Sequence, residues 1–511
     1  MPRKPMLSFI DDLLNRITMY RLVLYYLIVV WVAALVLSFF GIFPFPPLAL
    51  FASSALILAV SWGVNVLFAN AYGAATGSES VYITALILTL ILPPAASLDA
   101  AGAAFLVFAS AWAMGSKYLI APGKKHVFNP AAFGAAFAAL ALGMSANWWA
   151  AGSLWLAPFV IVGGILVVRK LRRADLAFSF FAVALATTFA LTSQSDWGNA
   201  LSGTFLHSAL FFLAFVMLTE PLTMPSGRIW RIVYAGLVGL LFAPQVNIFG
   251  YYFAPEMALL VGNLFAYFVS PKGRFMLTLT EKKMLGDGVY EFAFASDKPL
   301  RFAPGQYLEW TLPHPWPDAR GNRRYFTVAS SPTEAAVRLG VKFYDPPSTF
   351  KRALAGMRRG AMLSASHVAG EFTMPKDPRR KLAFIAGGIG VTPFRSMVQY
   401  LLDRQEQRSV ALLYSNKTAG EIAYRDIFDR AGRELGMKTV YAVTDDPSAQ
   451  GPGIYNGFID ANLIAREVPD YRERTFYISG PRGMVEAFKK SLREMGVSRW
   501  RIKTDYFPGF A

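Results

Sequence analysis

RRYFTVASSP at residues 323–332 and AFIAGGIGVTP at residues 383–393 are the stretches that decide the fold of the second half of this 511-residue chain. In the second stretch, an apolar run typical of a buried strand passes into glycines and then into a predicted helix. Glycine lets backbone N–H groups at a helix N-terminus approach a pyrophosphate, because no Cβ stands in the way. A glycine turn that serves only strand-to-helix packing is the alternative. The glycine-rich stretch comes after a strand with Arg, aromatic and Thr residues, and this order favours a pyrophosphate-binding site over a turn that serves packing only.

The region from residue 271 onward predicts two domains. Six short runs with period-two alternation predict a small antiparallel β-barrel over residues 271–378. After the charged linker KDPRRK, strand-like runs alternate with helical ones, which predicts an α/β domain with a parallel sheet over residues 379–511. The barrel strands are FMLTLT, VYEFAFAS, QYLEWTL, RYFTVAS, VRLGVKFY and MLSASHV, and the parallel strands are KLAFIAGG, SVALLYSN, KTVYAVT and RTFYISG.

The first half of the chain consists almost entirely of long runs of apolar residues. The chain is 54% hydrophobic, with a mean hydropathy of +0.37. Residues 21–270 contain about ten apolar segments, most of them near the roughly 20 residues that cross a bilayer. The longer ones lie near 21–40, 48–69, 98–119, 148–168, 176–192, 203–219, 230–247 and 255–270, and two shorter ones lie near 81–93 and 128–143. If ten spans are drawn, every Lys and Arg before residue 271 falls at a terminus or loop on one side. Because basic loops stay cytoplasmic, we expect an all-α multi-pass domain of the cell membrane, with the N-terminal segment 1–20 and the C-terminal domains in the cytoplasm.

Proline-marked strings recur in the two halves of this region with opposite orientation. TLILPPAAS ends the third predicted span and MLTEPLTMP the eighth, while FNPAAFG begins the fifth and FAPEMALLVGN the tenth. The pattern predicts an inverted five-plus-five repeat of interrupted helices, whose backbone ends can bind a ligand near the midplane. Prolines that merely mark span ends are the alternative. Glu220 and Glu256 lie in these strings and are candidates for ion or proton handling, unless they are wet interfacial groups.

The residue types present restrict the redox chemistry. The chain has no cysteine, which excludes thiolate-held iron–sulfur clusters and disulfides. Haems held by histidine pairs need facing histidines, whereas this half offers only His126 and His207, at opposite faces in the drawn topology. We therefore expect no metal site and an organic carrier. The basic C-terminal half favours an anionic lipid surface or a dinucleotide as partner, and nucleic acid is not expected because no binding motif accompanies the charge.

The C-terminal half resembles the ferredoxin–NADP reductase superfamily. The flavin motif of that family, Arg-x-Tyr/Phe-Ser/Thr-x-x-Ser, is matched by Arg324, Phe326, Thr327 and Ser330. The resemblance implies that Arg324 neutralises the pyrophosphate of FAD, Phe326 covers the isoalloxazine and Thr327 hydrogen-bonds near its N5. It also assigns PGQY (304–307) and GEF (370–372) to the barrel, and Ser348 and Thr349, after two prolines where glycine is common, to a second phosphate-binding position.

The same resemblance covers the nicotinamide side. YISGPRGM (477–484) is similar to the family's Cys-Gly-Pro-x-x-Met, with Ser479 in the Cys position. Phe507 or Phe510 would shield the flavin until nicotinamide binds, unless these rings only pack in a core. Lys417 would meet a 2′-phosphate, but no Arg pair accompanies it, so NADH is favoured over NADPH. Thr327, Ser479 and Phe507 are thus the candidate catalytic residues, and the remaining cofactor-binding residues implied are Gly387, Gly388, Gly390, Thr392, Pro393, Gly480, Pro481 and Met484.

The membrane half has its own resemblance. VYITALILTLILPP, FNPAAFG and MLTEPLTMP look like strings in the D subunit of the Rnf electron-transport complex and the B subunit of the sodium-translocating NADH:quinone reductase. The resemblance implies ten spans in an inverted-repeat fold and a bound flavin, which in those proteins includes FMN esterified to Thr in Ser/Thr-Gly-Ala-Thr. ATGS (75–78) and LSGT (201–204) do not match that sequence. We therefore expect a non-covalent flavin, FMN or riboflavin, or a quinone.

These predictions favour an NAD(P)H:acceptor oxidoreductase that is flavin-dependent and membrane-bound. Electrons would pass from NADH or NADPH through FAD to the flavin or quinone of the membrane domain. Because about 30 Å of hydrocarbon separates the two sides, transfer outward to a quinone or an extracytoplasmic redox protein requires that intermediate carrier. The alternatives are a transporter-like domain that the reductase module drives or regulates, and a domain that only anchors the module.

Overall fold

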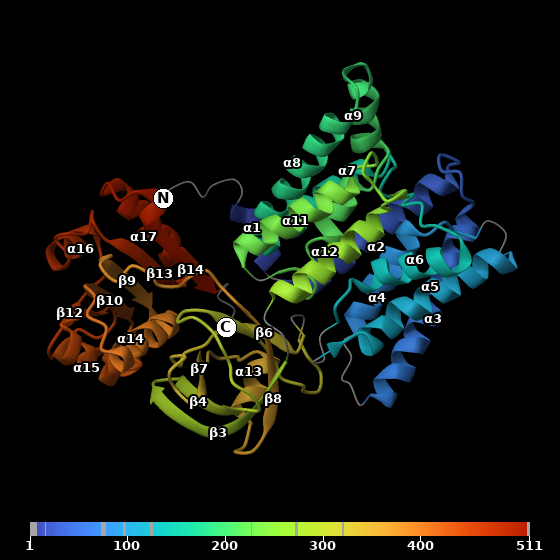
Figure 1. Cartoon of the computed structure of the whole chain (residues 1–511). Helices are drawn as coiled ribbons and strands as arrows, with labels where there is room; N and C mark the ends of the chain where they lie inside the picture. The colour runs from blue at the N-terminus through green and yellow to red at the C-terminus, as the bar shows by residue number, and fades with distance from the viewer. Residues whose placement is uncertain are drawn as a thin grey trace. The chain divides into compact units, whose positions relative to one another are not determined.

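A computed structural model describes residues 8–15, 17–72, 78–95, 99–122, 126–225, 227–270, 274–318 and 321–507. The chain divides into two compact units, Met1–Gly273 and Arg274–Ala511. The first unit is built of helices, and the second contains two sheets with helices (Figure 1). The division falls where the apolar excess of the sequence ends.

The first unit is helical because its segments are long runs of apolar residues with good helix propensity, separated by Pro, Gly and charged residues. Large apolar side chains lie on its surface as well as in its core, as Phe178, 75% exposed, shows. Its helices are α1 (Ser8–Asn15), α2 (Met19–Phe39), α3 (Pro47–Ala71), α4 (Ser78–Ile91), α5 (Ala100–Leu119), α6 (Pro130–Leu142), α7 (Ala157–Leu171), α8 (Ala174–Leu191), α9 (Trp197–Leu206), α10 (Leu210–Phe212), α11 (Arg228–Phe242) and α12 (Pro255–Val269), with the π-helical turn η3 (Leu213–Met217) and the hairpin β1 (Asn247–Ile248) and β2 (Tyr251–Tyr252).

Among the described residues, three helices are long and apolar enough to cross a membrane, namely α2, α3 and α8. A fourth candidate is the pair Gln194–Leu206 and Leu210–Met217, which is bent by 52°. Shorter apolar helices cover Glu79–Ile91, Pro130–Leu142 and Pro255–Val269. Three to four candidate spans are thus observed by length and composition, and the arrangement of about ten spans stays a prediction.

Two of the predicted spans have the wrong helical extent. The span drawn over 148–168 is helical only from Ala157, because Trp148 and Trp149 are buried and the Trp148 N–H donates to the Ile91 carbonyl at 2.9 Å. The span drawn over 203–219 breaks before Leu210. There the Ser208 hydroxyl donates to the Thr204 carbonyl at 2.5 Å and accepts from the Leu210 N–H at 3.2 Å, so the side chain competes with the helical backbone bonds.

Helix pairing is repeated in the two halves of the first unit. α3 packs against α5 and α5 against α6, and likewise α8 packs against α11 and α11 against α12. Glycine permits close approach in both halves. A Cβ on Gly134 in α6 would lie 2.3 Å from the Ala109 carbonyl oxygen, and a Cβ on Gly239 in α11 would lie 2.7 Å from that of Phe180. The same pairing of three helices therefore occurs twice in the first unit, and the inverted five-plus-five repeat stays a prediction.

The second unit begins with a six-stranded antiparallel sheet of order β6-β5-β8-β3-β4-β7. Alternate residues of its strands face one core that contains the buried rings of Trp310, Phe292 and Phe350. The Ala329 N–H, just after β6, donates to the Arg338 carbonyl of β7 at 2.8 Å, so the two edges of the sheet meet as in a barrel. All six predicted strands are present: β3 (Phe275–Gly286), β4 (Val289–Ser296), β5 (Tyr307–Thr311), β6 (Arg323–Thr327), β7 (Val337–Lys342) and β8 (Met362–Ala369), with α13 (Thr349–Ala355) beside them.

The remaining residues form a parallel sheet of order β12-β11-β10-β9-β13-β14. Strand order runs outward from β9 in one direction and from β13 in the other, so the switch point lies between these two strands. In open α/β sheets, ligands bind there at the carboxyl ends of the strands. The four predicted strands are present, and β12 and β14 are two edge strands that the sequence did not predict. The elements are β9 (Leu382–Gly387), α14 (Thr392–Arg404), β10 (Val410–Asn416), α15 (Arg425–Leu435), β11 (Lys438–Val443), β12 (Ile454–Asn456), α16 (Ala461–Glu467), β13 (Thr475–Pro481), α17 (Arg482–Glu494) and β14 (Ile502–Phe507).

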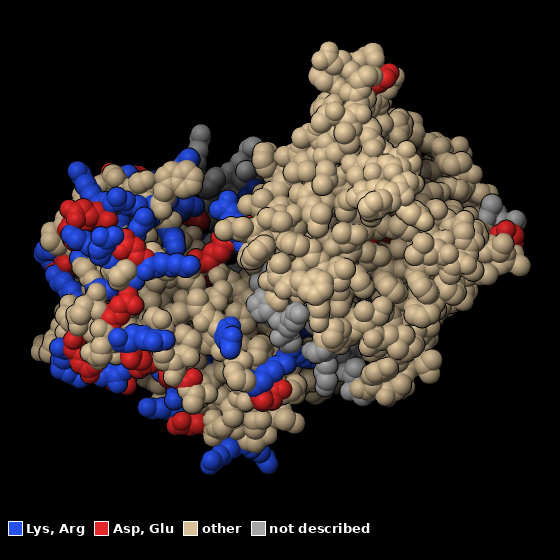
Figure 2. Space-filling view, viewed as in Figure 1, with Lys and Arg blue, Asp and Glu red and all other residues tan. Residues whose placement is uncertain are grey.

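Charged side chains are distributed very unevenly between the units. On the face drawn in Figure 2, Lys, Arg, Asp and Glu cover the second unit, whereas the first unit presents almost none. A large uncharged apolar surface is unusual for a unit that faces water.

Candidate functional site

The flavin motif lies at the end of β6. This strand pairs with β5, and Thr327 lies opposite Tyr307. Thr327 is 3% exposed, and its Oγ1 atom is buried without a hydrogen-bond partner among the described residues. Such a hydroxyl is uncommon because leaving it unpaired costs about 1–3 kcal/mol. Its position fits a group that completes its hydrogen bonding with a ligand.

Arg324 has an intrachain partner that the sequence does not reveal. Its Nη2 atom donates to both carboxylate oxygens of Asp318, at 2.9 and 3.1 Å, and Nη1 donates to the Gly321 carbonyl at 2.9 Å. The guanidinium also lies 5.2 Å from the centre of the Phe350 ring. Arg324 is therefore held in one orientation by an anion, at the position where the sequence predicts a phosphate.

Ser348 and Thr349 open α13 beside this pair. Ser348 caps the helix, and its side chain accepts the backbone N–H three residues further on. The Oγ1 atom of Thr349 accepts from the Asp318 N–H at 2.9 Å and lies 3.1 Å from Nε2 of His314. Because Asp318 contacts both Thr349 and Arg324, the structure brings the two predicted phosphate-binding positions together.

The glycine-rich turn lies at the switch point of the parallel sheet. Gly387 ends β9 and Thr392 begins α14. Gly388 has φ +52°, and a Cβ there would meet nothing within 4 Å, so the backbone is open at this point. A Cβ on Gly390 would lie 2.6 Å from the Cα of Gly480. The two glycine turns at the ends of β9 and β13 therefore touch, and only glycine allows this contact.

Ser479 lies beside this turn, at the end of β13. It is fully buried, and in the sheet it lies between Ala386 of β9 and Asp505 of β14. Its Oγ atom, like that of Thr327, has no hydrogen-bond partner among the residues that the structure describes. The sulfur of Met484 would lie 2.4 Å from a Cβ on Gly387, so Met484 packs directly on the glycine turn.

The barrel and the parallel sheet meet where α14 begins. The Ser396 hydroxyl of α14 donates to the Ser330 carbonyl of the flavin motif at 2.6 Å. A Cβ on Gly340 of β7 would lie 2.8 Å from Cγ2 of Thr392. The two predicted motifs thus touch through α14. With two unpaired buried hydroxyls and an open glycine turn, the residues fit FAD and a nicotinamide dinucleotide.

Three further residues were singled out in the sequence, and the side chains of two of them lie outside the described residues. The backbone of Phe507 lies in β14 opposite Pro481, whereas its side chain and the whole of Phe510 lie outside the described residues. Lys417 is exposed, and its N–H donates to Glu421 at 3.4 Å. The flavin shield and the 2′-phosphate contact therefore stay predictions.

A polar cluster surrounds Glu220 in the first unit. Its carboxylate accepts from Asn129 Nδ2 at 2.9 Å and from the Thr223 hydroxyl at 3.1 Å, and it lies 3.3 Å from Nε2 of His126. The Asn129 N–H donates to the side chain of Asn263 at 2.8 Å. The sequence indicated Glu220 but neither asparagine, although Asn129 lies in the string FNPAAFG and Asn263 ends the string FAPEMALLVGN.

Glu256 is the second candidate carboxylate, and it is fully buried. Its Oε2 atom accepts from Trp148 Nε1 at 2.8 Å, and Oε1 has no partner within the described part of the chain. The alternative of a wet interfacial group is therefore wrong for Glu256. His207 is exposed, and the described residues contain no His, Cys, Asp and Glu group that could hold a metal ion.

The profile of the family described as Oxidoreductase NAD-binding domain matches residues 384–490. The C-terminal region is ferredoxin–NADP reductase-like. The stachydrine N-demethylase reductase subunit Stc4 of Rhizobium meliloti is 28% identical over 233 residues, 44% of this chain and 64% of the relative. The flavohemoprotein of Oceanobacillus iheyensis is 25% identical over 210 residues, 40% of this chain and 51% of the relative.

Solved structures also resemble this chain. The flavohem-like FAD/NAD binding domain of nitric oxide dioxygenase from Vibrio cholerae is 20% identical and matches with a TM-score of 0.41, over 46% of this chain and 98% of that domain. The chain spans less than two thirds of the length of either relative named above. The ferredoxin–NADP reductase-like region is an oxidoreductase module that uses FAD and NAD(P)H.

Proposed function

We propose that this protein is a membrane-bound NAD(P)H-dependent flavin oxidoreductase. Electrons pass from NAD(P)H to FAD in the second unit and then to a flavin or quinone held by the first. The observation that carries the proposal is the contact between Ser330 of the flavin motif and Ser396 of α14. Because α14 follows the glycine-rich turn, we call it the nicotinamide helix. The contact stands in a chain whose other unit contains three apolar helices long enough to span a membrane.

The site residues take separate roles in this proposal. When bound, FAD would supply the redox chemistry, as the acceptor of a hydride from the nicotinamide. Arg324 and Thr349 hold the FAD phosphates, and the Thr327 hydroxyl, unpaired within the described chain, hydrogen-bonds the flavin ring. The turn from Gly387 to Gly390 and the N-terminus of α14 receive the dinucleotide pyrophosphate. Ser479 positions the nicotinamide, and the absence of an Arg pair beside Lys417 favours NADH.

In this proposal, the first unit passes the electrons on to the final acceptor. We place it in the cell membrane as a ten-span inverted repeat similar to the Rnf and sodium-translocating reductase subunits, with the second unit in the cytoplasm. The repeated helix pairing supports this arrangement. Glu220 and Glu256 then lie among apolar helices, where ionisable residues usually serve function. The final acceptor is a quinone or an extracytoplasmic redox protein.

The name of the Rhizobium meliloti relative describes a reductase subunit of an N-demethylase. A reductase subunit works with a second protein, and we propose that the membrane unit takes the place of that second protein within one chain. The ferredoxin–NADP reductase-like module would then still take its electrons from NAD(P)H, but would pass them to the first unit instead of to a second protein.

Cofactor content tests the proposal most directly. We expect the purified full chain to hold FAD and either a second flavin or a quinone, and NADH to reduce both under anaerobic conditions. Arg324→Ala should lose FAD, and with it the reduction of the second carrier. One flavin per chain, together with no NADH-dependent reduction of an added quinone, would contradict the relay. That result would favour a membrane unit that anchors the module or transports a solute.

A further inference from the structure

Two hydrogen bonds tie the backbone of the flavin motif directly to the nicotinamide helix. The Arg395 Nη1 atom donates to the Ala329 carbonyl at 3.2 Å, and the Ser396 hydroxyl donates to the Ser330 carbonyl at 2.6 Å. Ala329 and Ser330 follow closely on Thr327, and Arg395 and Ser396 lie in the first turns of α14. The path from the flavin-contacting strand to the dinucleotide-binding turn is therefore short.

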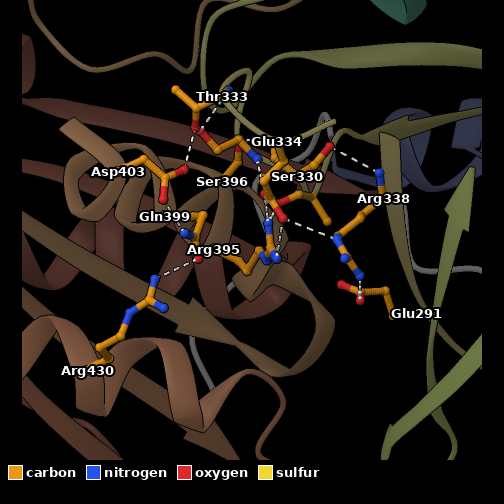
Figure 3. Close-up of polar contacts among 12 residues, drawn as sticks. Glu291, Ser330, Thr333, Glu334, Arg338, Arg395, Ser396, Gln399, Asp403 and Arg430 are labelled. Carbon is orange, nitrogen blue, oxygen red and sulfur yellow. Dashed lines mark hydrogen bonds and ion pairs between the residues drawn. The ribbon is translucent and has the colours of Figure 1, made fainter. Parts of the chain in front are cut away.

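A chain of alternating charges fixes this junction. Arg395 donates from both terminal nitrogens to Glu334, with Nη2 to Oε1 at 3.0 Å. Arg338 Nε donates to the same Glu334 oxygen at 3.1 Å, and its Nη1 donates to Glu291 at 2.6 Å. Figure 3 shows Arg395 reaching from α14 toward Glu334, and Arg338 lying between Glu334 and Glu291. Two carboxylates and two guanidinium groups thus balance each other across the junction of the barrel and α14.

The chain of charges also holds the loop that carries the flavin motif. The Glu334 Oε2 atom accepts from the Ser331 N–H at 2.6 Å, and the Ser330 hydroxyl accepts from the Arg338 N–H at 3.0 Å. The side chains of Arg395 and Glu291 are each 6% exposed, and those of Glu334 and Arg338 are 18% and 27% exposed, so water competes least for the bonds that Arg395 and Glu291 make. Glu334 therefore orients both the flavin-motif loop and the nicotinamide helix.

The geometry of this network is more specific than stability alone requires. A paired guanidinium and carboxylate fix direction as well as distance, whereas apolar packing of similar volume often gives equal or greater stability than a buried ion pair. Tyr424 lies against the network, with the Arg395 guanidinium 5.6 Å from its ring centre. Burial and the nearby Glu291 carboxylate raise the pKa of Tyr424 well above its ordinary value, so this neighbour stays uncharged.

We infer that Glu334, Arg395 and Ser396 are positioning residues that set where the nicotinamide lies relative to the flavin. The inference rests on the proposed function, because it concerns hydride transfer from the nicotinamide to FAD. None of the three residues touches the reacting atoms in this assignment. They act by holding α14 against the flavin strand, and a displacement of about 1 Å in such an arrangement slows transfer by roughly a hundredfold.

Anaerobic stopped-flow reduction of FAD in the full-length protein tests the inference, with NADH and with NADH deuterated at the transferred position. We expect Ser396→Ala and Glu334→Gln to slow reduction at saturating NADH about tenfold. The deuterium isotope effect should rise, because transfer itself becomes slower than the other steps. FAD content and the NADH concentration for half-maximal rate should stay within about twofold of wild type, which separates misplacement from lost binding.

Asp470→Asn is the matched control. It removes a carboxylate that pairs with Arg474 at 2.6 Å and Lys381 at 3.0 Å, within the parallel-sheet domain and away from the flavin motif. We expect it to leave the reduction rate and the isotope effect unchanged. If Glu334→Gln does not retain FAD, Ser396→Ala decides, because that variant deletes one hydroxyl and keeps every charge.

Wild-type rates and isotope effects in Ser396→Ala and in a correctly folded Glu334→Gln would overturn the inference. A lower melting temperature with an unchanged isotope effect would also overturn it, since that result assigns the network a structural role only. Failure of the wild-type protein to reduce its FAD with NADH or NADPH is a different result. It would contradict the proposed function rather than the positioning role.

Discussion

The Asp318 carboxylate accepts two hydrogen bonds from Nη2 of Arg324, at 2.9 and 3.1 Å. The same residue donates its N–H to Thr349 at 2.9 Å. One residue therefore engages both positions that the sequence assigns to the phosphates of FAD. Because Arg324 is only 13% exposed at its side chain, a phosphate that binds there must share the guanidinium with Asp318 or displace it.

Removal of the Asp318 charge should therefore strengthen FAD binding. We expect Asp318→Asn to raise the affinity of the FAD-free protein for FAD about tenfold, since one competing anion of a charge-assisted pair is lost. Arg324→Ala should lower that affinity by a similar factor or more. Titration followed by flavin fluorescence measures both changes.

Asp377→Asn serves as the control for this titration, because Asp377 pairs with the exposed Arg379 at 3.2 Å on the domain linker. It should leave FAD affinity unchanged. Weaker FAD binding by Asp318→Asn would show instead that Asp318 helps Arg324 to bind the cofactor.

A methyl group at Gly390 should disrupt the dinucleotide site. The added Cβ would lie 2.6 Å from the Cα of Gly480 and 2.6 Å from the carbonyl oxygen of Ser479, and backbone atoms cannot swing aside. We expect Gly390→Ala to raise the KM for NADH at least tenfold and to lower stability by about 1–3 kcal/mol, while FAD stays bound. Steady-state kinetics and thermal unfolding measure these effects.

Gly483→Ala is the comparison for Gly390→Ala. Gly483 lies in α17, and a Cβ there meets nothing within 4 Å. Its exchange for Ala should leave KM unchanged and raise stability by about 0.5–1 kcal/mol, as helix propensity predicts. Equal kinetic behaviour of the two variants would remove the touching glycine turns from the binding site.

Asp470 should contribute stability that depends on pH. Burial raises the pKa of Asp470, but hydrogen bonds from Arg474 and Lys381 outweigh this effect and hold the pKa below its ordinary value. The unfolded chain binds the proton more tightly, so the contribution is complete above pH about 4 and is lost as the pH falls through the lower folded-state pKa.

Thermal unfolding at several pH values checks this contribution. We expect Asp470→Asn to lower the midpoint of the second unit by about 2 °C at pH 7, as a partly exposed ion pair allows, and by less as the pH falls below about 4. Glu494→Gln removes the exposed pair with Lys490 and should change the midpoint little at any pH. A difference for Asp470→Asn that grows toward acid would contradict the assignment.

Periodicity in the sequence predicted ten of the twelve described strands of the second unit, all except the edge strands β12 and β14. VYEFAFAS coincides with β4 (Val289–Ser296), because alternation of core and surface residues fixes a strand and its register. Contacts between distant residues left no such signal. Ser330 and Ser396 meet across 66 positions of the chain, and nothing local to either serine encodes that meeting.

The first unit was harder to predict, because large apolar side chains lie on its surface as well as in its core, and hydropathy alone does not mark where a helix begins. The span drawn from residue 148 shows the consequence. Trp148 reads as part of a hydrophobic run, yet its ring nitrogen donates to Glu256 at 2.8 Å. A buried polar contact therefore replaced the first turns of the predicted helix.

Exchange of Glu256 should separate the two halves of the proposed electron path. Glu256 is fully buried and accepts only the Trp148 bond among its described contacts, so a neutral Gln of equal size keeps that bond and removes the ionisable group. If Glu256 handles protons during quinone reduction, Glu256→Gln should slow NADH:quinone activity at least tenfold. NADH:ferricyanide activity, which draws electrons from FAD, should stay within about twofold of wild type, because the flavin and nicotinamide residues lie in the other unit.

Trp148→Phe removes the hydrogen bond and keeps the carboxyl group, so it should retain more quinone activity than Glu256→Gln. Equal loss of both activities in Glu256→Gln would point to damage beyond the first unit, and full retention of quinone activity would show that the Glu256 carboxyl takes no part in the reaction.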